Sequence, residues 1–382
     1  MDAQHTTFLF AGGGTGGHIF PALAIAEALQ ESAPGCGCVF LVSERALDAE
    51  ILRKQSVGGR PARFERVPAR PFGVTPRVLY QFVSNWGLSV RVSRGHVREA
   101  RGGGACVVVA MGGFVAAPVA QAARVEGVPV LLVNLDAVPG RANRWVARRA
   151  ARVLTSAVVA GGAGGGAAGG GEVIPPIVRA GAVSAKGRGE CRESLGLDGA
   201  KPTLLVTGGS QGASSINDFL SAYAGGAGAS ALAGWQVIHQ TGPGRGEGAV
   251  REAYARAGVG AVVAPFFDRM GECWGAAELA VCRSGAGNVG EVWAGRVPSI
   301  FLPYPYHRDQ HQKYNAEALV RAGGAVVCED RIDAGANLAG AGACLTELLQ
   351  NAGKRGAMRS ALEALGPADG AGRVARALVS LV

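Results

Sequence analysis

Short apolar runs alternate with amphipathic stretches along most of the chain. In the first third, helical spacing such as that of residues 22–30 separates apolar runs at residues 7–11, 39–42, 107–110 and 128–133. A second series begins at residue 204, with apolar runs at 204–206, 236–239, 262–263, 279–282, 299–302 and 325–328. Buried strands that alternate with helices are typical of parallel sheets with crossover connections. The pattern therefore predicts two doubly wound α/β domains.

The composition changes abruptly between the two series. Residues 160–171 are all Ala or Gly, and Pro175 and Pro176 follow them. Such a stretch cannot hold a packed core, so it marks a loop close to a domain boundary. We expect an N-terminal domain over residues 1–175 and a C-terminal domain over residues 176–365, with a C-terminal helix in residues 366–382 that packs back on the first domain.

Charge and cysteine content narrow the classes of function. The formal net charge is +9, but only 5 of the 38 basic residues are Lys. The excess of Arg, together with that of Gly and Ala, indicates codon bias. We therefore expect no nucleic-acid partner. The 8 Cys include no CxxC pair, which favours thiols in a reducing compartment. The uncharged residues 102–123 contain Pro118 and five Gly and fit a strand, a turn and a helix better than a membrane span.

Each predicted domain opens with a glycine-rich turn between a strand and a helix. The two turns read GGGTGGH at residues 12–18 and GGSQGA at residues 208–213. Glycines let the backbone approach a ligand, and the next helix directs unpaired N–H groups at an anion. Neither turn has the dinucleotide spacing, and Glu44 is the only acidic residue placed to bind a nicotinamide cofactor's ribose, so a dehydrogenase ranks last. The duplication predicts two phosphate sites facing a cleft.

These turns belong to a longer series of motifs. The series comprises AGGGTGGHIFPA (11–22), MGG (111–113), NRW (143–145), GGSQGA with Asn217, HQTG (239–242), FFDRM (266–270), CRSGA (282–286) with Glu291, and HQKYNA (311–316). In this order, over nearly the whole chain, it resembles the MurG family of glycosyltransferases. That family transfers N-acetylglucosamine, with inversion, from UDP-N-acetylglucosamine to the 4-hydroxyl of N-acetylmuramic acid in lipid I, giving lipid II. The resemblance implies the GT-B fold, with two Rossmann-like domains facing across a cleft, and neither a cofactor nor a metal.

The resemblance places most of the donor site on the C-terminal domain. Ser210 and its loop would bind phosphate, the backbone of Phe267 would read uracil, and Glu291 would accept hydrogen bonds from the ribose hydroxyls. Helix N-termini and Arg283 would stabilise the leaving diphosphate, while His311 and Gln312 would bind the hexose 3- and 4-hydroxyls. The other donor-binding residues that the resemblance implies are Thr15, Gly16, Gly17, Arg179, Ala286, Gly287 and Asn288.

On the acceptor side, His18 would bind the acceptor pyrophosphate or act as a base. The other acceptor-binding residues that the resemblance implies are Gly14, Phe114, Asn134, Asn143 and Asn217. The chain departs from the family here, with Asn134 in place of Glu, Asp136 in place of Asn and Phe114 in place of Tyr. We hypothesise that Asp136 takes over the missing carboxylate role, with His18 as its partner.

A separate pattern concerns a membrane. The apolar residues between 71 and 94 have helical spacing and are surrounded by Arg77, Arg91 and Arg94; they are Val78, Leu79, Phe82, Val83, Trp86 and Val90. Such a face either packs in a core or lies in a lipid interface. The resemblance favours peripheral binding to the anionic cytoplasmic face of the inner membrane, because lipid I carries a polyprenyl tail.

Three related functions stay open at this point. One is a GT-B transferase that acts on a different lipid or on a small aglycone, which would account for the altered acceptor loop. The second is a UDP-sugar epimerase, which would share the UDP site. The third is a donor-binding pseudoenzyme, suggested by Asn134 and Phe114.

Overall fold

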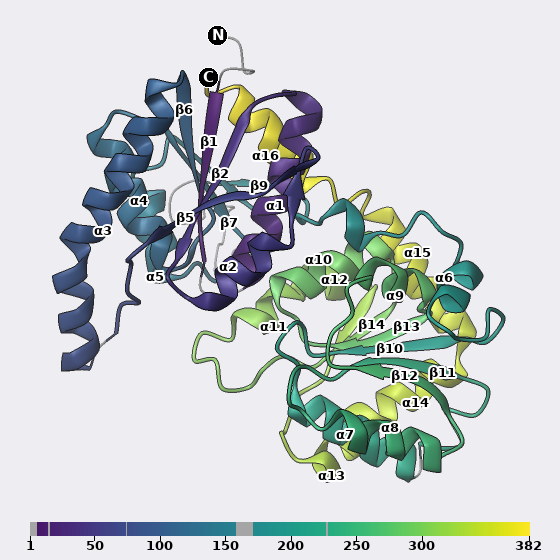
Figure 1. Ribbon diagram of the computed structural model, residues 1–382. Helices are drawn as coiled ribbons and strands as arrows, with labels where there is room; N and C mark the ends of the chain where they lie inside the picture. Colours follow the sequence, from purple (N-terminus) through teal and green to yellow (C-terminus); the bar gives the residue numbers. More distant parts are fainter. Residues whose placement is uncertain (1–5, 14–15, 74, 158–170, 227) are drawn as a thin grey trace. The chain divides into compact units, whose positions relative to one another are not determined.

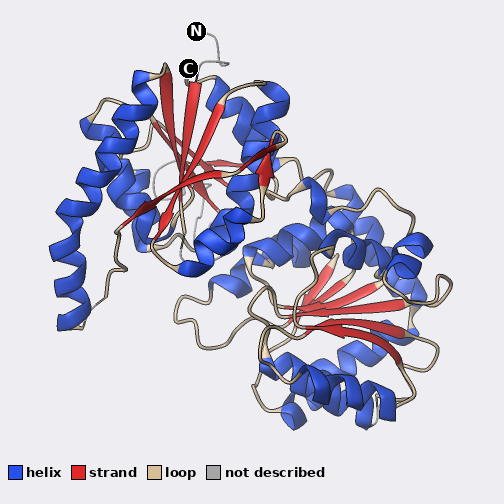
Figure 2. Ribbon diagram, viewed as in Figure 1, coloured by secondary structure: helices blue, strands red, loops and turns tan. Residues whose placement is uncertain are grey.

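The chain folds into two compact units, each built on one parallel sheet with helices on both faces (Figures 1 and 2). The computed structural model describes residues 6–13, 16–73, 75–157, 171–226 and 228–382. Unit 1 comprises Met1–Arg179 and Asp369–Val382, and unit 2 comprises Ala180–Ala368. The two predicted doubly wound domains are confirmed. Gly14, Thr15 and nearly all of the Ala/Gly run at 160–171 lie outside the described residues.

Unit 1 contains a sheet with the strand order β5-β2-β1-β6-β7-β8-β9, all neighbours parallel. Its strands are β1 (Thr6–Ala11), β2 (Gly37–Ser43), β5 (Arg63–Val67), β6 (Ala105–Ala110), β7 (Val130–Asn134), β8 (Arg152–Thr155) and β9 (Glu172–Val173), beside the antiparallel pair β3 (Ser56–Val57) and β4 (Arg60–Pro61). Its helices are α1 (Gly16–Ser32), α2 (Ala46–Arg53), α3 (Pro76–Gly102), α4 (Gly113–Val125), α5 (Arg141–Ala147) and α16 (Gly370–Val379). Sequence pattern missed β5 and β8 because they lack a continuous apolar run.

The core of unit 1 follows the two faces of its central strand. Leu9 of β1 packs with Val108 and the α4 residue Val115 on one face. On the other face Phe10 stacks on Phe40, with ring centres 5.2 Å apart. The C-terminal helix α16 packs against α1, so the end of the chain completes the N-terminal unit (Figure 1).

Unit 2 contains a sheet with the strand order β12-β11-β10-β13-β14-β15, again all parallel. Its strands are β10 (Thr203–Thr207), β11 (Gln236–Gln240), β12 (Gly260–Ala264), β13 (Leu279–Cys282), β14 (Ser299–Phe301) and β15 (Ala325–Val327). Its helices are η2 (Ala180–Ala182), α6 (Arg188–Ser194), α7 (Ser214–Gly225), α8 (Glu247–Arg256), α9 (Met270–Ala276), α10 (Ala286–Gly295), α11 (His311–Asn315), α12 (Glu317–Ala322), α13 (Ala334–Asn337), η3 (Leu338–Gly342), α14 (Ala343–Gln350) and α15 (Ala352–Ala364).

Strand β10 divides the core of unit 2 in two. Leu204 and Val206 face the cluster built by α7 and α14, while Leu205 between them faces the cluster around Trp274 of α9. This alternation is that of a strand buried on both faces. All six apolar runs predicted in this half of the chain are strands of the sheet.

The strand order fixes where a ligand can approach each sheet. In unit 1 the chain reverses its direction of winding between β1 and β6, and in unit 2 between β10 and β13. Loops that leave neighbouring strands on opposite faces open a crevice at the carboxyl edge of the sheet. Both glycine-rich turns follow the first strand of such a pair, so both lie at a switch point.

Helix α3 differs from the other helices of unit 1 because its N-terminal half has no core face. Its buried residues are Ser89, Ser93 and Val97, all in the second half, whereas Tyr80 and Val83 are 73% and 62% exposed. Figure 1 shows the first half extending beyond the sheet of the unit. Within the described residues, no helix is long and apolar enough to cross a membrane.

Candidate functional site

The glycine-rich loop 208–213 of unit 2 is held by backbone-to-backbone contact. A Cβ atom on Gly212, whose φ is +68°, would lie 2.0 Å from the carbonyl oxygen of Thr241, and one on Gly208 would lie 2.3 Å from the Ala213 nitrogen. No side chain could be added at either position without moving the loop. The loop ends at α7, whose N-terminus has no side-chain cap, and it leaves Ser210 exposed.

A second turn lies beside this loop, after the neighbouring strand β13. It leads into α10, whose N-terminus begins at Gly285 without a side-chain cap. Asn288 donates a hydrogen bond to the carbonyl oxygen of Arg283 (2.9 Å), which closes the turn. The first turn of α10 contains Ala286, Gly287 and Asn288, all three expected at the diphosphate. Two uncapped helix N-termini at one sheet edge suit an anion with two phosphates.

Arg283 lies at this edge but is paired inside the unit. Its guanidinium is 2.6 Å from the carboxylate of Asp330 and donates to Ser215 Oγ (2.9 Å) and to the carbonyl oxygen of Leu302 (2.7 Å). Burial lowers the pKa of Arg283, and the charge of Asp330 opposes that effect. Arg283 therefore lies at this edge as a hydrogen-bond donor whose charge is already paired with Asp330, and its expected contact with the diphosphate stays a prediction. Sequence analysis missed Asp330 because no motif contains it.

Glu291 lies on α10, and one oxygen of its carboxylate accepts a hydrogen bond from within the unit. Trp274 Nε1 donates to its Oε2 (2.8 Å), and burial raises the pKa of Glu291 to about 7. A buried carboxylate with a single neutral donor still lacks hydrogen bonds. Its remaining acceptor capacity matches two hydroxyl donors, such as those of a ribose. No signal in the sequence pointed to Trp274.

The segment after β14 carries Gln312 and a group of rings. Gln312 Oε1 accepts a hydrogen bond from the Tyr304 backbone nitrogen (2.9 Å), so its NH2 group keeps its donors for other partners. His311 Nδ1 lies 2.8 Å from Asp309 Oδ1, and its ring stacks near that of His307, with centres 4.3 Å apart. The two predicted hexose-binding residues are thus consecutive on α11, each oriented by a neighbour.

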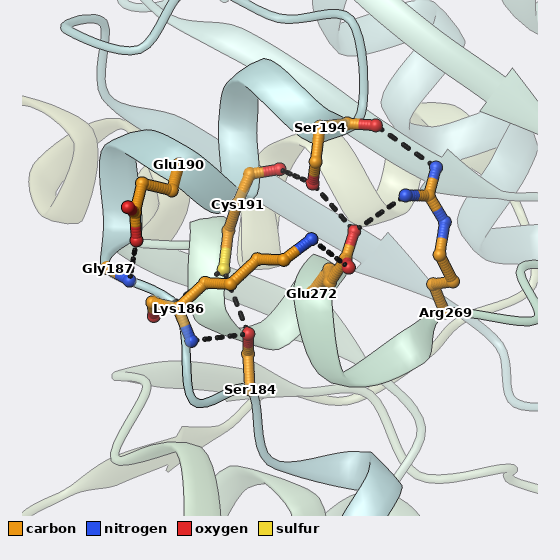
Figure 3. A network of polar contacts seen from close by, with 8 residues as sticks. All are labelled: Ser184, Lys186, Gly187, Glu190, Cys191, Ser194, Arg269 and Glu272. Atoms are coloured by element: carbon orange, nitrogen blue, oxygen red, sulfur yellow. Dashed lines mark hydrogen bonds and ion pairs between the residues drawn. The ribbon is translucent and has the colours of Figure 1, made fainter.

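Phe267 stands in a loop that is braced from two sides. Its backbone N–H donates to Gln240 Oε1 (3.0 Å), so only its carbonyl remains for a base in this state. The next helix is anchored by Glu272, which accepts from Lys186 (2.7 Å), Ser194 (2.6 Å) and Arg269 (3.0 Å) (Figure 3). Salt bridges and hydrogen bonds from these residues lower the pKa of Glu272. This network holds Arg269, two residues after Phe267, against α6.

In unit 1, His18 packs against two glycine turns. A Cβ atom on Gly12 would lie 3.3 Å from His18 Cβ, and one on Gly112 would lie 3.1 Å from His18 Nε2 and 3.0 Å from Asn143 Oδ1. Burial lowers the pKa of His18, whereas the charge of Asp136 raises it. His18 Nδ1 is buried and has no hydrogen-bond partner among the described residues. His18 and Asn143 therefore lie around the same glycine, Gly112, and the charge of Asp136 acts on the His18 imidazole.

The residues expected to bind the acceptor differ in burial and in their internal hydrogen bonds. Asn134 donates to the Asp136 carbonyl oxygen (2.7 Å) and to Thr155 Oγ1 (3.1 Å), and it accepts from Asn143 (3.0 Å). Both amide hydrogens of Asn134 are used, so it positions the backbone of Asp136 instead of facing a ligand. Phe114 is half-buried, with the Arg45 guanidinium 5.3 Å from its ring centre. Gly16 and Gly17 form the start of α1.

Two of the expected ligand-binding residues are occupied inside the protein. Asn217 is buried in unit 2, where it donates to the carbonyl oxygens of Thr241 and Arg245 (3.1 Å each) and contacts His239 (3.1 Å). Arg179 is held in unit 1 by Glu27 and Gln55. The hydrogen-bonding capacity of both side chains is largely spent on internal partners, so neither is carried into the proposed ligand contacts.

The candidate ligands for a cation are the His, Cys, Asp and Glu side chains in the described part of the chain. No group of three or more His, Cys, Asp or Glu side chains there is close enough to hold a metal ion. The groups at the unit 2 edge that could bind an anion are the helix N-termini, the loop 208–213 and the guanidinium of Arg283.

Two family models match most of the chain. Residues 8–155 match the glycosyltransferase family 28 N-terminal domain, and residues 203–371 match the glycosyltransferase family 28 C-terminal domain. The chain is similar to the UDP-N-acetylglucosamine–N-acetylmuramyl-(pentapeptide) pyrophosphoryl-undecaprenol N-acetylglucosamine transferase of Nocardioides sp. (34% identity, covering 98% of this chain and 97% of that protein) and to the protein of the same name from Desulforudis audaxviator (35% identity, covering 94% of each).

A solved structure shares the fold. The crystal structure of Acinetobacter baumannii MurG matches with a TM-score of 0.69 at 24% identity, over 98% of this chain and 99% of that one. The two parallel-sheet units of this chain are the two Rossmann-like domains of the GT-B fold. On both domain matches and on the full-length relatives, the chain belongs to glycosyltransferase family 28, within the MurG family of N-acetylglucosamine transferases.

Proposed function

We propose that this protein transfers N-acetylglucosamine from UDP-N-acetylglucosamine to the 4-hydroxyl of N-acetylmuramic acid in lipid I, forming lipid II. The observation that carries the proposal is the edge of the unit 2 sheet. That edge carries the uncapped N-termini of α7 and α10, which suit a diphosphate, and Glu291, whose remaining acceptor capacity suits a ribose. His311 and Gln312, consecutive on α11, suit a hexose. The full-length relatives named for this reaction support the same substrates.

The donor would be bound by unit 2. The N-termini of α7 and α10, together with Arg283, would bind the diphosphate. Glu291 would accept hydrogen bonds from the ribose hydroxyls, and the carbonyl of Phe267 would face uracil. Gln312 would donate to the hexose. When the bond to the anomeric carbon breaks, negative charge grows on the leaving phosphate, where these fixed dipoles stabilise it without rearranging.

The acceptor would be bound by unit 1, with His18 as the base. Burial keeps its imidazole neutral near pH 7, so it can accept the proton of the attacking hydroxyl. The charge of Asp136 stabilises the imidazolium that results. Asn134 and Asn143 hold Asp136 in place through its backbone. Thus the two departures from the family pattern, Asn134 and Asp136, act as one unit in this proposal.

The exposed half of α3 would bind the membrane that contains the lipid acceptor. Phe72, Phe82, Trp86 and Trp145 form a continuous row of ring contacts with centre distances of 5.4, 5.4 and 6.1 Å. The Arg141 guanidinium lies 5.2 Å from the ring centre of Phe72, at the border of this row. Arg94, expected at the rim, is instead paired with Glu126 (2.6 Å). Aromatic rings beside Arg are typical of a helix in an anionic lipid interface.

The first prediction tests the reaction itself. Purified protein should transfer labelled N-acetylglucosamine from UDP-N-acetylglucosamine to a lipid I analogue, and EDTA should leave the rate unchanged, because the proposal assigns the diphosphate to helix N-termini and Arg283. Product analysis by mass spectrometry distinguishes this outcome from epimerisation of the donor. Donor binding without any glycolipid product would contradict the proposed acceptor.

A second prediction concerns the base. Asp136→Asn should lower kcat by about tenfold with little change in the KM for the donor, because His18 loses the charge that supports its protonated form. Steady-state kinetics of the transfer would measure it. Glu172→Gln, which removes an exposed carboxylate elsewhere in unit 1, is the matched control. Full activity of Asp136→Asn would refute the His18–Asp136 pairing.

The third prediction concerns pH and Glu291. Uridine should bind about tenfold more weakly at pH 6 than at pH 8, because a carboxyl with a pKa of about 7 is mostly protonated at pH 6 and then accepts fewer hydrogen bonds from the ribose. Calorimetric titration with uridine avoids the titration of phosphate. Glu291→Gln should bind uridine weakly and equally at both values of pH. Unchanged wild-type affinity across this range would exclude Glu291 from the ribose site.

The fourth prediction concerns the membrane surface. Val83→Asp should reduce co-flotation with vesicles that contain anionic phospholipid by about tenfold, because one apolar side chain buried in lipid stabilises binding by about 1.5 kcal/mol. Val83 is exposed, so the fold should be unaffected. Val183→Asp, the same substitution at another exposed Val (48% against 62% for Val83) in unit 2, is the control and should float like wild type. Equal flotation of both variants would place the membrane contact elsewhere.

A further inference from the structure

Asp330 lies in the segment that follows β15 and is buried, although no motif includes it. Its Oδ2 accepts from Ser215 Oγ (2.6 Å) and faces Arg283 Nη1 (2.6 Å). Its Oδ1 accepts from the backbone nitrogen of Ile332 and from Asn337 Nδ2 (2.9 Å each). Four donors therefore surround one carboxylate. Burial alone would raise the pKa of Asp330, but these hydrogen bonds and the charge of Arg283 hold it below its usual value.

The same contacts decide which part of Arg283 remains available. A guanidinium carries five N–H donors. Nη1 uses two of them on Leu302 and Asp330, and Nη2 uses one on Ser215. Nε–H and the second hydrogen of Nη2 have no partner in the described ranges. Two adjacent donors on one edge match two oxygens of a phosphate, which is the arrangement of a bidentate contact.

The backbone beside Asp330 shows that this position is strongly determined. Ile332 has a φ of +64°, a left-handed conformation that a β-branched residue rarely adopts. Its backbone nitrogen is the one that Asp330 Oδ1 accepts from. An unfavourable conformation persists only where surrounding contacts enforce it. The backbone conformation of this segment thus directs the Asp330 carboxylate at Arg283 and Ser215.

Ser215 connects this pair to the phosphate loop. It is the second residue of α7, directly after the loop 208–213, while Arg283 begins the turn after β13. The Asp330 carboxylate therefore joins the ends of β10, β13, β14 and β15 through one set of hydrogen bonds. A shift of this carboxylate would change the separation of the two turns that the donor diphosphate has to contact.

We propose that Asp330 is a positioning residue of the donor site: together with Ser215 it occupies one edge of the Arg283 guanidinium and leaves the other edge for the donor diphosphate. The inference rests on the proposed function for the identity of the donor. It adds a residue outside every motif, and it means that Arg283 acts as a directed pair of donors whose charge is balanced before the donor arrives.

The test compares two ligands that differ only in the diphosphate. Calorimetric titrations at pH 8 measure the Kd of UDP and of uridine for wild type and Asp330→Asn. We expect the UDP Kd to rise by about tenfold or more, the usual effect of losing a hydrogen bond to a charged group, and the uridine Kd to stay within about twofold. Glu329→Gln, which removes an exposed carboxylate from the neighbouring position, should leave both Kd values unchanged.

A second variant set keeps the inference testable if Asp330→Asn folds poorly. Arg283→Met combined with Asp330→Asn removes both charges, so neither is left buried alone. Its UDP Kd should equal that of Arg283→Met by itself, because Asp330 acts only through Arg283. Asp330→Glu, which keeps the charge, should retain more UDP affinity than Asp330→Asn.

The possible results are distinct from one another. Equal weakening of UDP and uridine by Asp330→Asn would mean general damage to unit 2 and would overturn the inference, as would additive losses in the double variant. Selective loss of UDP binding supports it even if the wild-type chain transfers no sugar to lipid I, in which case only the acceptor assignment fails. A wild-type chain that binds neither ligand would refute the donor site and the inference together.

Discussion

The reversal of winding in each parallel sheet is the constraint on which the rest of the structure depends. Because β10 is hydrogen-bonded between β11 and β13, the helices that follow β10 and β13 leave on opposite faces and their N-termini meet at one edge. The loop 208–213 can enter that edge only because its glycines allow contact between backbones, as at Gly212 against Thr241. The same geometry in unit 1 places His18 against the turn at Gly112, beside β1 and β6.

Buried charge is handled in two different ways at the edge of unit 2. Arg283 receives a full counter-charge from Asp330, so the pair stays ionised in a place where an isolated charge would be costly. Glu291 receives only the neutral N–H of Trp274, and burial consequently raises its pKa to about 7. The first arrangement is complete within the protein, whereas the second leaves acceptor capacity on Glu291, which we propose is used by hydroxyl donors of a ligand.

Two polar features of unit 1 depend on how its elements pack. The departures Asn134 and Asp136 are neighbours in one network, in which an amide holds the backbone that presents a carboxylate. Helix α3 is likewise divided by burial, since it is anchored by Ser89 and Val97 in its second half and presents Tyr80 and Val83 to solvent in its first. The pattern of apolar residues alone was equally consistent with a core helix, whereas the structure shows that Ser89, Ser93 and Val97 are the buried residues of α3.

The sequence by itself determined the two parallel-sheet units, the place of both glycine-rich turns and the family, because buried strands, tight turns and ligand-binding backbones each demand local residue types. It could not determine which polar side chains face a ligand. Asn217 and Arg179 stand in recognisable positions, yet internal partners occupy them, while Asp330 and Trp274 stand in no motif and hold Arg283 and Glu291. Those pairings join residues up to 152 positions apart (Glu27 to Arg179), so only the tertiary structure, which decides what each buried group meets, could reveal them.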